Sequence, residues 1–323
     1  MKSKYCGAFV VLWLSVSVFN NVSAQVFPSK PVRWIVPFPP GGTGDFVVRT
    51  VSGPMTKSMG QNVIVDFRPG GTTIVGTELT ARAPADGYTL LFVANSFTIN
   101  PAVRSKLPYN TLNDFSGVAR MVITPFVIAV HPSLPAKSFQ ELLRLARARP
   151  GELTYGTAGT AGGQHLAGEL LSQMAKVSLV HVPYQGIAPL NIATIGGQVT
   201  IAVTNVPDAA PYVAANRLRA LAVTSISRSP AMKDIPTVAE LGYPGYEMQL
   251  WIGAVVLRAT ARDAVNRLST EIVRALEQQE VKVAFDKLGL TPSPQAPEQF
   301  DAFIRAEMRQ NERIAKQANI RVD

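Results

Sequence analysis

The sequence predicts an α/β fold built from two lobes, and three observations support this prediction. Short apolar runs alternate with amphipathic stretches along most of the chain, a pattern typical of α/β proteins. Hydrophobic residues make up 47% of the 323 residues and charged residues 16%, so the chain can bury a substantial core. Two extended runs, residues 124–131 and 246–257, lack the Gly/Ser composition of a free linker, and we interpret them as crossings between the lobes.

The first part of the chain alternates predicted strands and helices. Apolar runs predict strands over residues 32–38, 63–67, 89–94 and 127–130. Amphipathic stretches predict helices over residues 45–59, 76–82 and 138–149. The last of these helices begins with a capping box, in which Ser138 is the N-cap and Glu141 follows three residues later.

The second part repeats the alternation. Strands are predicted over residues 154–156, 177–182, 199–203, 218–224 and 246–257. Helices are predicted over residues 163–174, 188–195, 209–216, 261–276 and 297–317. With two crossings, we expect residues 25–126 plus 249–323 to form lobe 1 and residues 127–248 to form lobe 2.

Residues 1–24 have the pattern of a signal peptide. Lys2 and Lys4 precede an apolar run at residues 7–19, which is shorter than the ~20 residues that a membrane-spanning helix needs. Small residues at Val22 and Ala24 favour cleavage after Ala24. The alternative is an uncleaved membrane anchor. We therefore predict an exported protein, periplasmic where the host has an outer membrane.

Cleavage also changes the chemistry of the chain. It removes Cys6, the one cysteine, so disulfides and thiolate chemistry are excluded from the mature protein. It lowers the net charge from +9 to +7, because two lysines leave. The remaining Lys and Arg are spread along the chain without interleaved aromatic residues, so no nucleic-acid partner is predicted.

Two glycine-rich loops each follow a predicted strand and open a predicted helix, at residues 37–45 and 155–165. Glycines let a ligand approach the backbone, and free N–H groups at a helix N-terminus attract anions. Neither loop has the ending of a P-loop or the Gly-x-Gly-x-x-Gly pattern, so nucleotide binding is not expected. The alternative for the first loop is a plain turn in which Asp45 caps the helix. Two anion-friendly loops in different lobes favour a ligand held between them.

Catalytic and metal-binding patterns are weak. No Gly-x-Ser-x-Gly elbow occurs, and the histidines are His131, His165 and His181. His165 and Glu169 lie one helical turn apart, but no third ligand has a recognisable spacing, so a structural or ligand-contacting role for His165 is favoured over a metal site. We predict neither an enzyme nor a cofactor.

Motifs in order along the chain carry a family resemblance. They include Pro28-Ser-Lys-Pro31, the loop at residues 37–45, Asp86-Gly87-Tyr88, His181-Val-Pro-Tyr184-Gln-Gly186 and Asp234-Ile-Pro-Thr. Over essentially the whole mature chain, the sequence resembles the solute-binding receptors of tripartite tricarboxylate transporters, the Bug family.

The resemblance implies a type II periplasmic-binding-protein fold, with two α/β lobes joined by two crossover strands that close around a carboxylate. It implies contacts from the first loop (Gly41, Gly42, Thr43 and Asp45) and from the second loop (Thr157, Ala158, Gly162 and His165). Further lining would come from Asn95, Ser96, Tyr184, Gly186, Thr204 and Asn205, with Phe38 and Tyr184 as an apolar wall.

Three departures from the family pattern bear on the ligand. Many members have Phe-Asp-Asn where this chain has Val203-Thr204-Asn205, and the segments at residues 72–76 and 257–262 also differ. Because Thr204 is neutral, we expect a di-, tri-, hydroxy- or aromatic carboxylate without an amino group. The alternative is that Asp45 or Asp208 supplies the missing acidic group.

The expected function is capture of such an organic acid by a monomeric protein and its delivery to membrane transporter subunits. A ligand-sensing receptor for a membrane signalling partner is the alternative, and an enzyme on the same scaffold is a third reading.

Overall fold

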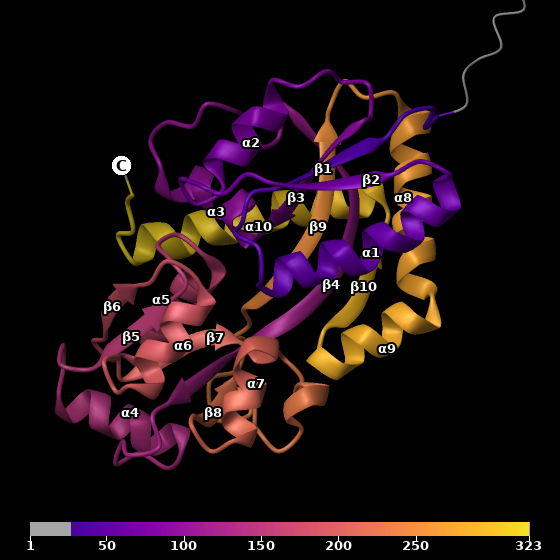
Figure 1. Ribbon diagram of the computed structural model, residues 1–323. Helices are drawn as coiled ribbons and strands as arrows, with labels where there is room; N and C mark the ends of the chain where they lie inside the picture. Colours follow the sequence, from indigo (N-terminus) through magenta and orange to yellow (C-terminus); the bar gives the residue numbers. More distant parts are fainter. Residues whose placement is uncertain (1–26, 323) are drawn as a thin grey trace, which may run out of the picture.

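The protein folds into two α/β lobes that lie one above the other and are joined by long strands (Figure 1). The computed structural model describes residues 27–322, so the predicted signal peptide lies outside the described residues. Within residues 27–322, no helix has the length and apolar character that crossing a bilayer requires.

The first lobe contains a parallel set of strands extended by an antiparallel strand. Its strands are β1 (Val32–Val36), β2 (Val63–Phe67), β3 (Thr89–Ala94) and β9 (Gln249–Leu257), in the order β2-β1-β3-β9. Its helices are α1 (Thr43–Met59), α2 (Ile74–Ala81), α3 (Asn95–Val103), α8 (Arg262–Glu277), α9 (Gln279–Leu288) and α10 (Pro297–Gln317).

Strand β4 (Phe115–Val130) runs through both lobes (Figure 1). Its residues 115–125 pair antiparallel with β9, and residues 120–123 also pair with β10 (Thr291–Gln295). From Phe126 onward its partners are β7 (Ile201–Asn205) and β8 (Arg219–Val223). This change of partners coincides with the lobe boundary expected near residues 126 and 249, because Pro125 pairs with Gln249. The division into two rigid units remains a prediction.

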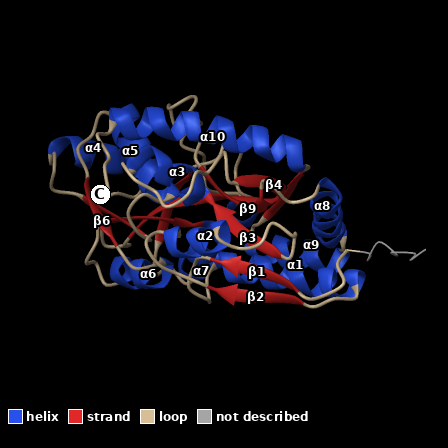
Figure 2. Ribbon diagram, turned by 90° about the horizontal axis from the view of Figure 1, so that it is seen from above, coloured by secondary structure: helices blue, strands red, loops and turns tan. Residues whose placement is uncertain are grey.

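The second lobe continues the sheet through β4, β7, β5 and β6. Its remaining elements are α4 (Phe139–Ala148), β5 (Thr154–Thr157), α5 (Gly163–Ala175), β6 (Val180–Pro183), α6 (Ile187–Ile195), α7 (Val206–Ala214) and the 3-10 turn η1 (Pro230–Met232). Seen from above, α3, α5 and α10 lie on one side of β4 and β9, whereas α1, α6 and α7 lie on the other (Figure 2).

Most predicted elements are confirmed, and the local signals act as expected. The stripe on α8 is buried, with Val265, Leu268, Ile272 and Leu276 at most 3% exposed. Each such side chain contributes about 1.5–3 kcal/mol of burial free energy. At the start of α4, the Glu141 N–H donates to Ser138 Oγ at 3.2 Å, which confirms the N-cap. The Glu141 carboxylate, however, accepts from the N–H of Lys137 and not from that of Ser138.

Besides the 3-10 turn η1, the first half of one strand and three further elements were not predicted from the sequence, each for a local reason. The first half of β4 contains two register shifts, between Gly117 and Ala119 and between Arg120 and Val122, and these disrupt the period-two alternation of a strand. Helix α3 contains Pro101 and follows β3 without a loop. Strand β10 contains two prolines, which usually mark a loop. Only one residue separates helix α9 from the end of α8, so the sequence shows no loop that would separate a second helix from the first.

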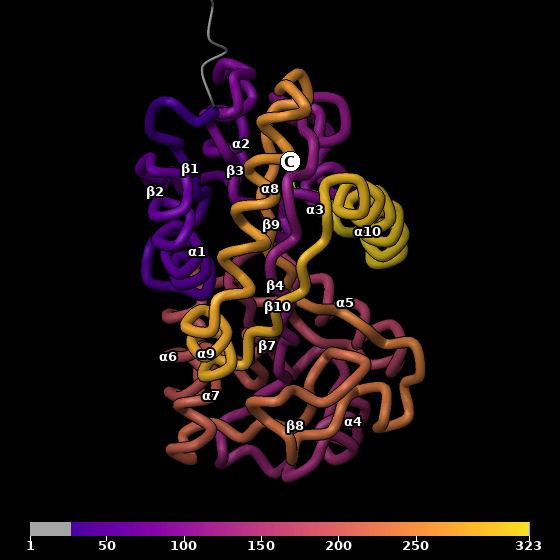
Figure 3. The backbone as a smooth tube through the Cα atoms, turned by 90° about the vertical axis from the view of Figure 1, so that its right-hand side faces the viewer, coloured from indigo at the N-terminus to yellow at the C-terminus, as the bar shows by residue number. Residues whose placement is uncertain are grey.

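Helix α10 connects the two lobes through its packing. It lies along α3 and extends toward α5 (Figure 2), and Figure 3 shows it nearly end-on beside α3. Ile314 and Ala315 near its end, and Ile99 and Val103 of α3, belong to the apolar cluster around Ile128 in the second lobe. The cores of the two lobes are therefore not formed by wholly separate stretches of the chain.

Candidate functional site

Four helices begin where the two lobes meet, each shortly after a strand of the sheet. Helices α1 and α3 belong to the first lobe and follow β1 and β3. Helices α5 and α7 belong to the second lobe and follow β5 and β7. The first N–H groups of a helix have no partner within it and carry a partial positive charge, so this arrangement suits an anion.

A chain of hydrogen bonds links three of these helix beginnings. The Thr43 hydroxyl on α1 donates to Asp208 Oδ2 on α7 at 2.8 Å, across the lobe boundary. Asn205, which precedes α7, donates to the same oxygen at 2.7 Å. Gln164 Nε2 on α5 donates to Asn205 Oδ1 at 3.0 Å. The beginning of α1 accordingly lies directly above α7 in Figure 1.

Helix α3 reaches the same place through Asn95, its first residue. A Cβ placed on Gly163, the first residue of α5, would lie 2.9 Å from Asn95 Cγ and 2.8 Å from Phe126 Cζ. Only glycine therefore fits at position 163 in this arrangement. Asn95 Nδ2 donates to the Gln249 carbonyl oxygen at 2.9 Å, whereas its Oδ1 is buried without a hydrogen-bond partner.

The first glycine-rich loop is held by Asp45. Its carboxylate accepts from the Gly41 N–H at 2.9 Å and pairs with Arg49. Gly41 has φ +91°, a conformation that favours glycine, and Gly42 is the N-cap of α1. Asp45 thus acts within its own loop, although the N-cap of α1 is Gly42 and not Asp45 as the plain-turn alternative expected.

Phe38 and Ser96 line a small, closely packed recess in the first lobe. Phe38 packs edge-to-face on Phe92, with ring centroids 5.6 Å apart. Thr73, whose hydroxyl donates to Ser96 Oγ at 3.3 Å, lines the same recess. The segment at residues 72–76, which departs from the family pattern, therefore still reaches the predicted site.

The second glycine-rich loop is braced by the segment that follows β6. The Tyr184 N–H donates to the Thr157 carbonyl oxygen at 2.9 Å, and the Gly186 N–H donates to that of Ala158 at 3.2 Å. The Tyr184 side chain packs on the small apolar cluster around Leu190. The backbone of this segment thus supports the loop, and the Tyr184 ring contributes to the packing of α6.

His165 and His181 lie behind this second loop as a stacked pair, with ring centroids 3.8 Å apart. Thr157 donates its hydroxyl proton to the Gly159 carbonyl oxygen, so His181 Nε2, 2.7 Å from Thr157 Oγ1, must be the donor of their hydrogen bond. His165 Nδ1 accepts from the Ala161 N–H at 3.2 Å. Burial lowers the pKa of His165 to about 3 and that of His181 to about 4, so both rings are neutral.

His165 is therefore occupied with positioning the loop. Its Nε2 lies 3.9 Å from Glu169 Oε1, and that oxygen accepts from the Tyr155 hydroxyl at 2.5 Å. Among residues 27–322, no three His, Cys, Asp or Glu side chains come together as a metal site.

The two remaining predicted residues differ in what they contribute. Asn205 is 4% exposed and lies at the centre of the hydrogen-bond chain described above. Thr204 is fully buried opposite Val127 of β4, and its hydroxyl has no hydrogen-bond partner. Asp208 is the acidic residue that accepts a hydrogen bond from the first lobe, through Thr43. The site therefore contains a carboxylate although residue 204 is neutral.

Burial raises the pKa of Asp208, although the hydrogen bonds from Asn205 and Thr43 act to lower it. Asp208 was expected only as an alternative acidic group, and Thr73, Gln164 and His181 were not among the predicted site residues. Polar residues directly after strand ends were the available signal for Asp208, which lies in the first turn of α7, three residues after Asn205.

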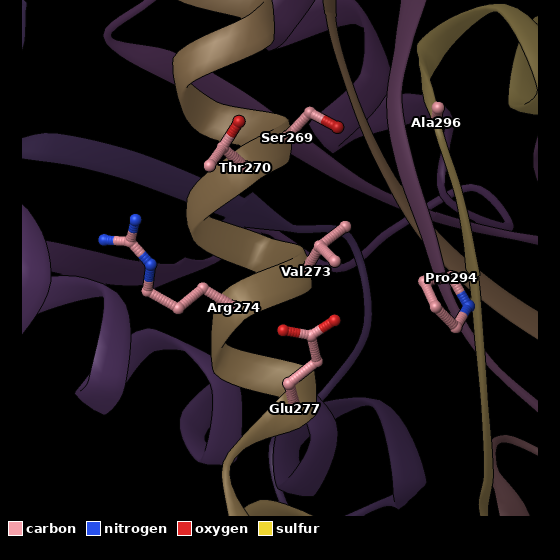
Figure 4. Close-up of a pocket in the computed structure, with 7 residues that line it drawn as sticks. All are labelled: Ser269, Thr270, Val273, Arg274, Glu277, Pro294 and Ala296. Carbon is pink, nitrogen blue, oxygen red and sulfur yellow. The ribbon is translucent and has the colours of Figure 1, made fainter.

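A second groove lies away from this site, between α8 and β10 (Figure 4). It has a volume of about 540 Å³ and is lined by Ser269, Thr270, Val273, Arg274, Glu277, Pro294 and Ala296. All of these residues belong to the expected first lobe, and the groove shares no residue with the predicted ligand site.

Comparison with known proteins identifies the family. The family model described as "Tripartite tricarboxylate transporter family receptor" matches residues 47–320. The chain belongs to the tripartite tricarboxylate transporter receptor family. This membership confirms the resemblance found in the sequence. A relative in this receptor family is Protein BugT of Bordetella pertussis, 33% identical over 289 residues, which are 89% of each chain.

Solved structures of similar proteins confirm the two-lobed fold. Rpa4515 of R. palustris, solved with adipate, has a TM-score of 0.86 and 32% identity, covering 91% of this receptor chain and 99% of its own. MatC from Rhodopseudomonas palustris, solved with bound malate, has a TM-score of 0.82 and 27% identity, covering 89% and 99%. The fold is therefore that of periplasmic solute-binding receptors.

Proposed function

We propose that this receptor captures a small organic carboxylate between its two lobes and delivers it to a membrane transporter of the tripartite tricarboxylate type. The observation that carries the proposal is the meeting of four helix beginnings, two from each lobe, at Thr43, Asn95, Gly163 and Asp208. A carboxylate in that place would receive N–H and hydroxyl donors from both lobes at once.

Further support comes from the polar atoms that the protein leaves unpaired there. The Thr204 hydroxyl is buried without a partner and can donate to a ligand carboxylate, whereas Asn95 Oδ1 only accepts and calls for a ligand hydroxyl or a water molecule. The relatives solved with adipate and malate bind dicarboxylates. We extend this to a di-, tri-, hydroxy- or aromatic carboxylate for this chain.

The receptor acts, in this proposal, as an exported, non-enzymatic monomer in the periplasm. Its mature chain would begin at Gln25, after removal of the signal peptide. N-terminal sequencing of the protein from the periplasm of its host checks the cleavage. An intact N-terminus in the membrane fraction would contradict it.

A thermal-shift screen against mono-, di-, tri- and aromatic carboxylates tests the binding function. A ligand present at 100 times its Kd stabilises the fold by about 2.7 kcal/mol. The amide counterpart of each acid is the matched control, because it keeps the shape and removes the charge. If no carboxylate raises Tm beyond its amide, carboxylate capture is wrong. Uptake of the identified acid by host cells with and without the receptor gene then tests delivery.

A further inference from the structure

Asp208 places a carboxylate at the point where the helix beginnings of the two lobes meet. Thr43 and Asn205 both donate to its Oδ2, at 2.8 and 2.7 Å. No hydrogen bond from the described protein groups reaches its other oxygen, Oδ1, and no ion pair with Lys, Arg or His forms at Asp208 within residues 27–322. One side of this carboxylate is therefore open to a partner.

The proposed ligand must come close to this group. Thr43 is the first residue of α1, and its hydroxyl donates to Asp208 Oδ2 at 2.8 Å. The free N–H groups at the beginning of α1, which we propose to hold the ligand, therefore lie beside the Asp208 carboxylate. A bare ligand carboxylate would then face a like charge in a place where solvent screening is weak.

Asp45, the other acidic residue near the site, does not create the same repulsion with a ligand carboxylate. The Asp45 carboxylate is paired with Arg49 and accepts from the Gly41 N–H. Its charge is thus balanced within its own loop. The Asp208 carboxylate, in contrast, accepts hydrogen bonds from the neutral side chains of Thr43 and Asn205. A ligand that donates a further hydrogen bond to it would stabilise its negative charge.

We propose that Asp208 selects ligands that carry a hydrogen-bond donor on the carbon next to the bound carboxylate. The donor would reach Asp208 Oδ1, while the ligand carboxylate takes the N–H groups of the helix beginnings. A hydroxyl and an ammonium share this chemistry, and the experiment below separates them. The inference rests on the proposed function, because it assumes that a carboxylate binds between the lobes.

Position 204 itself supplies no charge to the site. Thr204 is buried opposite Val127, and the acidic group stands at Asp208, in the next helix. The selective group thus approaches the ligand from the beginning of α7, on the side of Thr43.

Calorimetry with two series of probes tests the inference. The first series is succinate, L-malate and L-aspartate; the second is phenylacetate, mandelate and phenylglycine. In whichever series binds, we expect the donor-bearing acid to bind at least about tenfold more tightly than the bare acid, the value of a hydrogen bond to a charged acceptor. The hydroxy acid and the amino acid, compared with each other, show which donor Asp208 takes.

The variant Asp208→Asn keeps the shape and replaces the open acceptor by a donor. We expect the preference to fall below about threefold and the bare acid to bind more tightly than it does to the unaltered protein. Asp234→Asn removes the same charge at an exposed position of the second lobe and should leave the preference unchanged. If Asp208→Asn does not fold, Asp208→Ser removes the charge with a smaller side chain and should show the same loss of preference.

The outcomes separate the two proposals. Equal binding of bare and donor-bearing acids, or a preference that survives in Asp208→Asn, overturns the role of Asp208 while carboxylate capture stands. Absence of binding by every acid in both series and in the thermal-shift screen overturns the proposed function, and the role of Asp208 with it.

Discussion

The imidazole rings of His165 and His181 stack at a centroid distance of 3.8 Å, with 13° between their planes, directly behind the second glycine-rich loop. Each ring holds one end of that loop, His181 through the Thr157 hydroxyl and His165 through the Ala161 N–H. The bond from the Ala161 N–H needs an unprotonated Nδ1 on His165, so that end of the loop depends on His165 remaining neutral, whereas His181 donates from Nε2 in either protonation state.

The histidine pair predicts a loss of stability in mild acid. The pKa values of about 3 for His165 and about 4 for His181 lie below the ordinary value of 6.5. As the pH falls below 6.5, the unfolded chain binds protons that the folded protein does not, so the free energy of unfolding decreases until about pH 4 for the contribution of His181 and about pH 3 for that of His165. A fully buried histidine contributes up to ~1.4 kcal/mol per pH unit, and the partly exposed His181 contributes less.

Urea unfolding of the protein and of His181→Phe between pH 8 and pH 4 checks this prediction. The phenyl ring keeps the stacking but cannot titrate, so we expect a shallower decrease. The difference at pH 8 measures the lost hydrogen bond to Thr157 alone, about 1 kcal/mol. Burial raises the pKa values of Asp208 and Glu307, and these groups oppose the decrease in both proteins. Parallel curves for the two proteins would show that His181 does not titrate as described.

Gly163→Ala should weaken both folding and binding. The added Cβ would meet Phe126 Cζ at 2.8 Å and Asn95 Cγ at 2.9 Å, and Phe126 is fully buried. We expect a loss of about 1–3 kcal/mol in the free energy of unfolding, typical of overpacking. The added Cβ should also push Asn95, at the beginning of α3, away from the beginning of α5. We expect this displacement to weaken carboxylate binding, measured by calorimetry.

Gly53→Ala is the matched control for that variant. Gly53 lies on the exposed side of α1, and a Cβ there meets no atom within 4 Å. In a helix interior the change from glycine to alanine stabilises by about 0.5–1 kcal/mol. If Gly163→Ala behaves like Gly53→Ala, the close approach of the lobes at position 163 is wrong.

The first loop can be tested at Gly42, the N-cap of α1. Gly42→Pro removes one N–H from the helix beginning, and we expect carboxylate binding to weaken by about 1–3 kcal/mol. Gly42→Ala keeps that N–H, and with φ −103° and no atom within 4 Å its Cβ is accommodated, so binding should be retained. Unchanged affinity in a folded Gly42→Pro protein would exclude the first loop as the carboxylate site.

Local sequence patterns predicted those strands and helices whose regular period is not interrupted by bulges, prolines or buried polar residues. Strands β2 and β3 and helix α10 have the predicted bounds, because each is one uninterrupted run with a clear period. The first half of β4 was missed because its bulges depend on pairing with β9, which is distant in the sequence. Helix α3 was missed because Pro101 lies inside it and because polar residues such as Asn95 and Asn100 are buried on it, so the sequence shows no amphipathic pattern there.

The candidate site divides in the same way. The glycine-rich loops and Asn205 could be selected, since strand ends and helix starts are local features. The partnership of Thr43 with Asp208 could not be, because it joins residues 165 positions apart. The pairing of His165 with His181 likewise depends on how β6 lies beside β5, and no spacing in the sequence encodes it.

Ligand binding should make the protein more compact, because only the closed arrangement brings the donors of both lobes to one carboxylate. The hinge is expected where β4 changes partners, beside the pair of Pro125 and Gln249. Small-angle scattering with the acid identified in the screen should give a smaller radius of gyration at saturation than without ligand. No change at saturating ligand would contradict closure.

We expect helix α10 to limit that movement. Its Ile314 packs in the core of the second lobe, although most of the helix lies along α3 of the first. A lobe that opens must either slide past this contact or carry the end of α10 with it. Ile314→Ala shortens the buried side chain and loosens the contact, so we expect a larger radius of gyration without ligand and an unchanged one with ligand. The exposed variant Ile192→Ala, on α6, is the control, since Ile192 is 66% exposed and takes no part in the contact between lobes. Identical scattering of Ile314→Ala and Ile192→Ala without ligand would show that α10 does not restrain the lobes.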